Sequence, residues 1–302
     1  MGQHRDNITL HNLLLLGEPE AVAAVVHAPG LTPDLAKLAW WVLPEAEHAR
    51  RMLVQPQVAE SEIARELAKF LVEYLPFETE PNAIMNSVRL VLQPGLISEE
   101  EKNNLWKRAS RKGIYYVSFL QAMPDDLPGM CSAHPKHADI ESQLSFLLAK
   151  NNAYALLLNK VLSPGGQVFL KTAESAMDKL ADESTSVALF EAIGQYFSEA
   201  QSSGVSSDVF HGCGECRDSE GALARAKACM ADPEVISPEL AAVLAVIPDQ
   251  RERLIAILTL SFVGENLLDS FFSQSDTVGP LMRRKLAPWT KPILDQIRCL
   301  QK

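Results

Sequence analysis

Proline is the residue that most constrains how this chain can fold. Many prolines stand directly before an acidic or amide residue and an apolar run. Proline is well tolerated at the first position of a helix, and a carboxylate in the first turn suits the helix dipole. The pattern predicts a series of short helices that start at Pro19-Glu20, Pro33-Asp34, Pro44-Glu45, Pro81-Asn82, Pro233-Glu234, Pro238-Glu239 and Pro248-Asp249.

Capping residues strengthen several of these predicted starts. Thr32 and Ser237 each precede a proline and are suited to be N-caps. Ser98 and Glu101 have the spacing of a capping box. Within 57–75, one face of the predicted helix collects apolar residues at helical spacing, namely Ile63, Leu67, Phe70, Leu71 and Tyr74.

The residues between these starts favour helix as well. Ala, Leu, Glu, Lys and Gln dominate, and alternating β-branched runs are nearly absent. We therefore expect an all-α fold. The predicted helices are 19–28, 32–42, 44–54, 57–75, 80–92, 98–111, 113–122, 137–150, 151–161, 165–180, 184–201, 219–230, 233–246, 249–272 and 276–300, the last broken around Pro288 and Pro292. The more uniformly apolar 249–272 is expected to be a central buried helix.

Short helices joined by tight turns favour stacked antiparallel helix pairs, as in a HEAT-like α-solenoid. The sequence shows no repeat of fixed period, so an irregular helical domain is the alternative. We expect a single all-α unit over 1–302, with 1–123 and 137–302 as candidate sub-blocks. The Ser- and Gly-rich stretch 201–221 is expected to be a flexible loop.

Charge and composition exclude some classes of function. The 302 residues carry 28 Lys and Arg against 38 Asp and Glu, a net charge of −10. This excess of negative charge argues against broad binding to nucleic acid or to anionic membranes.

The longest apolar stretch, Leu254–Val263, is about half of the roughly 20 residues that a membrane span needs. The start MGQHRDNITL lacks the apolar core of an export signal. We expect a cytoplasmic protein whose five cysteines are thiols rather than disulfides.

One candidate metal site is the segment His211-Gly-Cys213-Gly-Glu-Cys216. Two thiolates at this spacing provide half of a tetrahedral zinc site, and His211 or Cys229 could supply more ligands. The same pair could cycle as a dithiol or carry persulfide. The sequence holds no second Cys-x-x-Cys to complete a zinc site, so ordinary loop cysteines are the alternative.

A second set of candidate ligands is Cys131, His134 and His137, which recur at every third residue. Pro135 argues against one continuous helix through them, because proline disrupts a helix interior. The set reads as a polar loop, or as a partner of the Cys213/Cys216 loop in a joint zinc site.

A basic cluster is a candidate interaction face. Lys107, Arg108, Arg111 and Lys112 have the spacing of one helix face, beside Trp106, Tyr115 and Tyr116. Such residues can bind an acidic protein, or single-stranded RNA through phosphates and stacking. A solvated helix face that balances Glu99–Glu101 is the simpler alternative. A second triplet, Arg283–Lys285, extends the cluster only if the fold brings the two together.

Several strings in the first 130 residues carry a resemblance to a known family. They are LLLLGEPEAV (13–22), APGLTPDLAKLAWWVLPEAEHARRML (28–53), FLVEYLPFETEP (70–81), SVRLVLQPGLISEEE (87–101) and YYVSFLQAMPDDLP (115–128). This part of the chain resembles the DsrS family of sulfur-oxidising bacteria. Those are cytoplasmic accessory proteins encoded alongside the reverse-acting dissimilatory sulfite reductase system.

The resemblance implies a biological setting and no chemistry, since the family has no established catalytic residue or cofactor. Family members carry further sequence ahead of a similar start, which implies a C-terminal fragment or a shortened gene product. We expect a non-enzymatic accessory or regulatory protein that contacts proteins of the sulfur-oxidation machinery, without a cofactor unless zinc binds. The alternatives are a thiol or metal protein that uses Cys213 and Cys216, and a regulator that contacts RNA through Lys107–Lys112.

Overall fold

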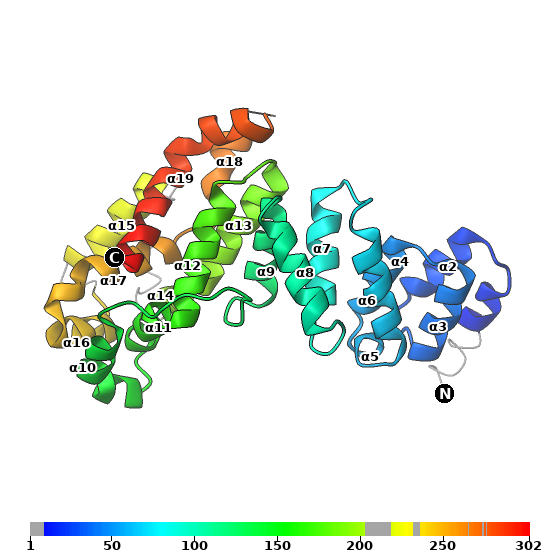
Figure 1. Cartoon of the computed structure of the whole chain (residues 1–302), viewed down its shortest axis with the longest axis horizontal. Coiled ribbons are helices and arrows are strands. Elements are labelled where there is room, and N and C mark those ends of the chain that lie inside the picture. Colours follow the sequence, from blue (N-terminus) through cyan, green and yellow to red (C-terminus); the bar gives the residue numbers. More distant parts are fainter. Residues whose placement is uncertain (1–8, 203–218, 232–235, 265, 274, 276) are drawn as a thin grey trace. The chain divides into compact units, whose positions relative to one another are not determined.

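The computed structural model describes residues 9–202, 219–231, 236–264, 266–273, 275 and 277–302. All regular structure in these residues is helical, which confirms the predicted all-α class (Figure 1). The chain divides into two compact units, Met1–Leu105 and Trp106–Lys302. Each unit is described by itself.

The N-terminal unit is built around one short helix. Its helices are α2 (Pro19–Val26), α3 (Pro33–Val42), α4 (Ala46–Leu53), α5 (Pro56–Ala59), α6 (Ile63–Tyr74), α7 (Pro81–Val91) and the first turns of α8 (Glu99–Ala109). Helix α4 packs against α2, α3, α5, α6 and α7. Its residues Ala49, Met52 and Leu53 are buried, so the apolar face of α4 forms the centre of this unit.

The predicted caps position these helices. Leu35 N donates to Thr32 Oγ1 at 3.3 Å, and Leu240 N donates to Ser237 Oγ at 3.2 Å. At the start of α8, Ser98 N donates to Glu101 Oε2 at 2.8 Å and Glu101 N donates to Ser98 Oγ at 3.2 Å. These hydrogen bonds, the backbone one first, lower the pKa of Glu101. The predicted capping box is therefore confirmed.

The C-terminal unit contains the remaining helices. They are α9 (Gly113–Ala122), α10 (His137–Ala149), α11 (Ala153–Leu162), α12 (Pro164–Met177), α13 (Glu183–Tyr196), α14 (Glu199–Ser202), α15 (Ser219–Ala231), α16 (Pro238–Val246), the 3₁₀ turn η2 (Pro248–Gln250), α17 (Arg251–Ser261), α18 (Asn266–Phe272) and α19 (Gly279–Gln301). Helix α17 packs against α13, α14, α15 and α19. The expectation of a central buried helix in 249–272 is confirmed for α17.

Several predicted boundaries are wrong, and one of them is the predicted helix 184–201, which forms α13 and α14. The segment 57–75 forms two helices, α5 and α6, and 249–272 forms the turn η2 followed by α17 and α18. Conversely, 279–301 is one helix that runs through Pro288 and Pro292. Its inward face, which includes Met282, Leu286 and Ile297, is fully buried. This burial holds the helix together although each proline removes a backbone hydrogen bond.

One bent pair of helices has the combined length and apolar composition of a membrane span. In the described ranges, no single helix combines the length and apolar composition needed to cross a bilayer. The segments 248–261 and 266–272, which meet at 61°, meet these two criteria only when taken together.

Candidate interaction surface

The predicted basic residues lie at a helix end and not along one helix face. Helix α8 ends at Ala109, and a turn follows in which Arg111 N and Lys112 N both donate to Arg108 O, at 3.0 and 3.1 Å. The predicted continuous face over 107–112 is therefore wrong, because the helix stops earlier. The side chains of Lys107, Arg111 and Lys112 are nevertheless exposed. Arg108 is half-buried, and its Nη1 has no hydrogen-bond partner among the described residues.

Lys179, just after α12, connects this turn to a second part of the C-terminal unit. Its Nζ donates to Ser110 O at 2.9 Å and to Ala109 O at 3.4 Å, and it lies 4.9 Å from the centre of the Tyr116 ring. A cation suits the carboxyl end of α8, where the last carbonyls have no partner within the helix. A Cβ at Gly113 would come 2.8 Å from Lys179 Cβ, so only glycine permits this close contact.

The second basic triplet reaches the same segment from α19. Arg283 Nη1 donates to Leu180 O at 2.7 Å, and Gly279 N donates to Ala181 O at 2.7 Å. Lys179 and Leu180 are consecutive residues, so the two basic groups meet on neighbouring peptide units. Arg284 and Lys285 beside Arg283 are exposed. The fold therefore brings the triplet 283–285 to the same segment as the basic residues of 107–112, which the sequence alone could not show.

We call this set the basic cluster. It consists of Lys107, Arg108, Arg111, Lys112, Lys179, Arg283, Arg284 and Lys285. Within the part of the chain that the structure describes, none of these side chains forms an ion pair with a carboxylate. Asp178, Asp182 and Glu183 are the acidic residues nearest in sequence to Lys179, and Asp182 caps α13 by accepting from Thr185 N at 2.8 Å. The cluster thus concentrates uncompensated positive charge on a chain of net charge −10.

The aromatic residues beside the basic cluster are used for packing. Trp106 packs edge-on against Tyr116 and Phe119, with both ring centroids 5.1 Å away. Tyr115 is buried. These rings do not form an open platform on which bases could stack, so the basic cluster offers charge and hydrogen-bond donors instead.

The predicted metal ligands Cys213, Cys216 and His211 lie outside the described residues, and that zinc or dithiol site remains a prediction. Among the residues that the structure does describe, there is no group of three or more His, Cys, Asp or Glu side chains that could hold a metal ion.

His134 serves a structural role in the C-terminal unit. Its backbone N–H donates to Leu162 O at 2.9 Å, its Nδ1 accepts from Lys136 N at 3.1 Å, and its Nε2 lies 3.2 Å from Arg253 Nη2. Because Nδ1 accepts, a neutral ring carries its proton on Nε2, which faces the Arg253 guanidinium, so His134 is a packed structural residue although the spacing Cys131-x-x-His134-x-x-His137 suggested metal ligation. Burial, followed by the charge of Arg253, lowers the pKa of His134.

A small polar cavity of about 360 Å³ lies in the same region. It is lined by Asp249, Glu252, Arg253, Asp295, Cys299 and Lys302. Burial raises the pKa of the Cys299 thiol, which keeps the sulfur protonated near neutral pH. A protonated thiol is a poor nucleophile and a poor metal ligand, so this shift does not favour thiolate chemistry at Cys299.

Stability is expected to fall on acidification because of His134. The unfolded chain takes up a proton at this histidine near pH 6.5, whereas the folded chain binds it only at a lower pH. The contribution is fully present above about pH 6.5 and is lost as the pH falls through the lowered folded-state pKa. Urea midpoints at pH 7 and pH 5 should differ less for His134→Gln than for the wild type. Equal differences in the two proteins would show that His134 is not the responsible group.

The structure thus defines an all-helical protein of two compact units, one of which carries the basic cluster. No family model, curated protein or solved structure matches this chain.

The sequence alone could not show that Lys179 and Arg283 lie near Lys107–Lys112. The contacts that bring them together join residues that are far apart in the chain.

Proposed function

We propose that this chain is a non-enzymatic accessory protein of bacterial sulfur oxidation that acts in the cytoplasm through protein–protein contacts. The observation that carries the proposal of an interaction role is the basic cluster, where three separate segments contribute cations without internal counter-charges. The sulfur-oxidation setting rests on the resemblance of the first 130 residues to the DsrS family. The basic cluster would receive an acidic segment of a partner protein.

Two features favour an acidic protein segment over nucleic acid. Tyr115 is buried, and the half-buried Trp106 packs edge-on against Phe119, which limits the ring surface open to bases. The chain as a whole has a net charge of −10, so a long polyanion would be repelled wherever it extended beyond the basic cluster. A short acidic segment avoids that repulsion. At physiological salt, screening weakens the interaction between charges that are more than about 8 Å apart.

Charge reversal of the basic cluster is expected to weaken binding of an acidic peptide by about tenfold or more, since complementary charges set both the encounter rate and the affinity. The probe is a fluorescent 12-residue Asp/Glu peptide, titrated by anisotropy at low and physiological salt. The test variant is Lys107→Glu, Arg111→Glu, Arg284→Glu and Lys285→Glu in the full chain, which changes only exposed side chains.

A control variant keeps the same change in net charge. It reverses four exposed lysines outside the basic cluster, namely Lys37, Lys171, Lys227 and Lys291. Equal weakening in both variants would show a general charge effect and overturn the proposed site. Tighter, salt-sensitive binding of single-stranded RNA than of the peptide would replace the proposal with the RNA alternative.

The biological setting needs its own test. The wild-type chain and the charge-reversed variant would be used as baits in lysate from sulfur-oxidising cells. We expect a component of the sulfite reductase system to be retained by the wild type and lost with the variant. Retention of no such component by the wild type would remove the sulfur-oxidation assignment, and the acidic-peptide result would stand independently.

A further inference from the structure

A row of four aromatic side chains runs from the core of the N-terminal unit to its surface. The ring centroids of Trp40 and Phe70 are 4.8 Å apart, those of Phe70 and Tyr74 are 5.9 Å apart, and those of Tyr74 and Phe77 are 6.2 Å apart. Trp40 Nε1 also donates to Glu66 Oε1 at 3.0 Å, which fixes the inner end of the row. We call these four residues the aromatic strip.

Exposure rises steadily along the aromatic strip. Trp40 is 6% exposed, Phe70 is half-buried, Tyr74 is 40% exposed and Phe77 is 75% exposed. The sequence predicted Phe70 and Tyr74 to lie on the core face of one helix. In the structure only Ile63, Leu67 and Leu71 of that face are buried, and the two aromatic residues lie along its edge. Contiguous exposed aromatic surface of this kind is typical of interaction sites.

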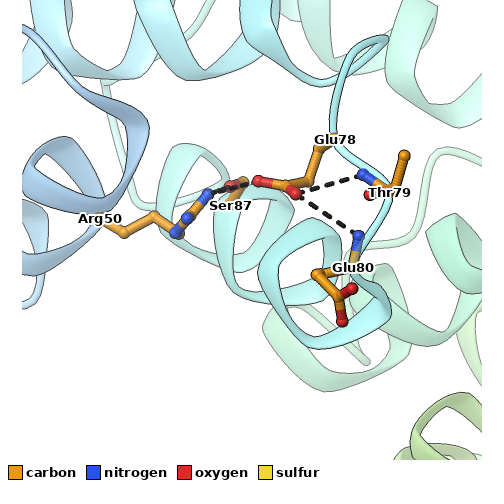
Figure 2. A network of polar contacts seen from close by, with 5 residues as sticks. All are labelled: Arg50, Glu78, Thr79, Glu80 and Ser87. Atoms are coloured by element: carbon orange, nitrogen blue, oxygen red, sulfur yellow. Dashed lines mark hydrogen bonds and ion pairs between the residues drawn. The ribbon is translucent and has the colours of Figure 1, made fainter.

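The backbone that follows the outermost ring is fixed by a polar network around Glu78. Phe77 precedes Glu78, whose Oε2 accepts from Arg50 Nη1 of α4 at 3.0 Å (Figure 2). The other oxygen, Oε1, accepts from the backbone N–H groups of Thr79 and Glu80, at 3.2 and 3.4 Å. Phe77 N itself donates to Tyr74 O at 2.9 Å. The connection between α6 and α7 is thereby ordered, so Phe77 can bind a partner at little conformational cost.

The surroundings of the aromatic strip are acidic. Glu66, Glu73 and Glu80 are exposed on α6 and at the start of α7, and Nζ of the exposed Lys69 lies 4.0 Å from Glu73 Oε1. Residues 1–105 contain eight Lys and Arg against fifteen Asp and Glu, a net charge of −7, so this unit holds most of the negative charge of the chain. This negative charge would repel an anionic lipid surface. It favours a positively charged partner protein at the aromatic strip.

The spacing of the aromatic strip fits a helical partner. Phe70 and Tyr74 are one turn apart on α6, and Phe77 follows in the turn after the helix, so successive ring centroids are 5.9 and 6.2 Å apart, close to one helical turn of about 5.4 Å. A partner helix with apolar residues at the same spacing can lay one face on these rings. Its lysines or arginines would then reach the nearby carboxylates or lie over the exposed ring faces.

We propose that the aromatic strip binds an amphipathic helix of a partner protein that is rich in Lys and Arg. This goes beyond the proposed function, because it assigns a second surface, on the other unit, to a partner of opposite charge. The proposal depends on neither the basic cluster nor the sulfur-oxidation setting. Failure of acidic peptides to bind would leave it untouched.

The probe is a fluorescent 16-residue peptide of Leu and Lys whose leucines follow the helical i, i+3, i+4, i+7 pattern. A peptide of the same composition with a scrambled order serves as the comparison. In the full chain, Tyr74→Ala with Phe77→Ala is expected to weaken binding of the patterned peptide about tenfold or more, since exposed aromatic anchors dominate such interfaces. Phe146→Ala, which removes a ring of similar exposure (66%) from the C-terminal unit, should change the affinity less than twofold.

Three results would overturn the proposal. The first is equal affinity of the wild type and the Tyr74/Phe77 double variant for the patterned peptide. The second is equal binding of the scrambled peptide, because this would reduce recognition to charge alone. The third is a dimer of the wild type in sedimentation experiments that the double variant abolishes, which would make the aromatic strip a self-association surface. Unchanged thermal midpoints would show that the variants fold, as expected for exposed side chains.

Discussion

Replacement of Gly194 by alanine is expected to destabilise the C-terminal unit by about 3 kcal/mol, because a close-packed interior does not accept an added methyl group against rigid backbone. Gly194 lies within α13, where a methyl group would overlap the carbonyl oxygen of Val263. That oxygen belongs to the chain that follows α17, and it cannot move without shifting this central helix. The measurement is the free energy of unfolding from urea denaturation of the full chain.

The sign of the change in unfolding free energy distinguishes the two possible outcomes. Alanine is the better helix former, so without the close contact Gly194→Ala would stabilise α13 by about 1 kcal/mol. A matched control is Gln195→Ala, one residue further along the same helix, where the side chain is exposed and the change should be within about 0.5 kcal/mol. A stabilised Gly194→Ala protein would show that α13 and the segment after α17 do not approach closely.

A displacement of α13 would also disturb the aromatic core at its carboxyl end. Tyr196 stacks on Phe169 of α12 with ring centroids 3.6 Å apart, and Phe197 contacts the same ring edge-on at 6.4 Å. Burial raises the pKa of Tyr196, which is consistent with a ring removed from water. The loss expected at Gly194 therefore includes weakened packing between α12 and α13.

Helix content could be predicted from the sequence because its signals are local. Proline at the first helical position and a capping residue just before it act within one turn, and Thr32, Ser98 and Ser237 all cap as predicted. Breaks inside long apolar segments were harder to predict. The segment 249–272 contains no proline between α17 and α18, and Gly264, which lies at the interruption, is a weak signal because a lone glycine is tolerated inside a helix.

Sites that depend on long-range contacts could be predicted only in part. Lys107–Lys112 and Arg283–Lys285 were each visible as charge, but their meeting depends on Lys179 and Leu180, whose sequence neighbours give no sign of it. The aromatic strip was hidden for a different reason. Phe70 and Tyr74 have the helical periodicity of core residues, so the sequence places them on the apolar face of α6. Periodicity does not show which residues at the margin of that face remain exposed, as these two do.

Tyr154 is expected to be the most costly side chain to truncate in the C-terminal unit, with Tyr154→Ala losing about 3–5 kcal/mol of unfolding free energy. It is the largest of the fully buried side chains, with no exposed surface. Its hydroxyl donates to Ala200 O at 2.7 Å, which connects α11 to α14. Alanine would leave both a cavity and an unpaired carbonyl.

Tyr154→Phe separates these two contributions. It keeps the ring and removes only the hydroxyl, so about 1–2 kcal/mol should be lost from the unpaired Ala200 carbonyl. Burial raises the pKa of Tyr154 to about 12, whereas the unfolded chain ionises near pH 10. The contribution is thus fully present below pH 10 and lost as the pH rises through the folded-state value. Alkaline destabilisation should be weaker in Tyr154→Phe than in the wild type, and equal alkaline profiles would contradict a buried, hydrogen-bonded Tyr154.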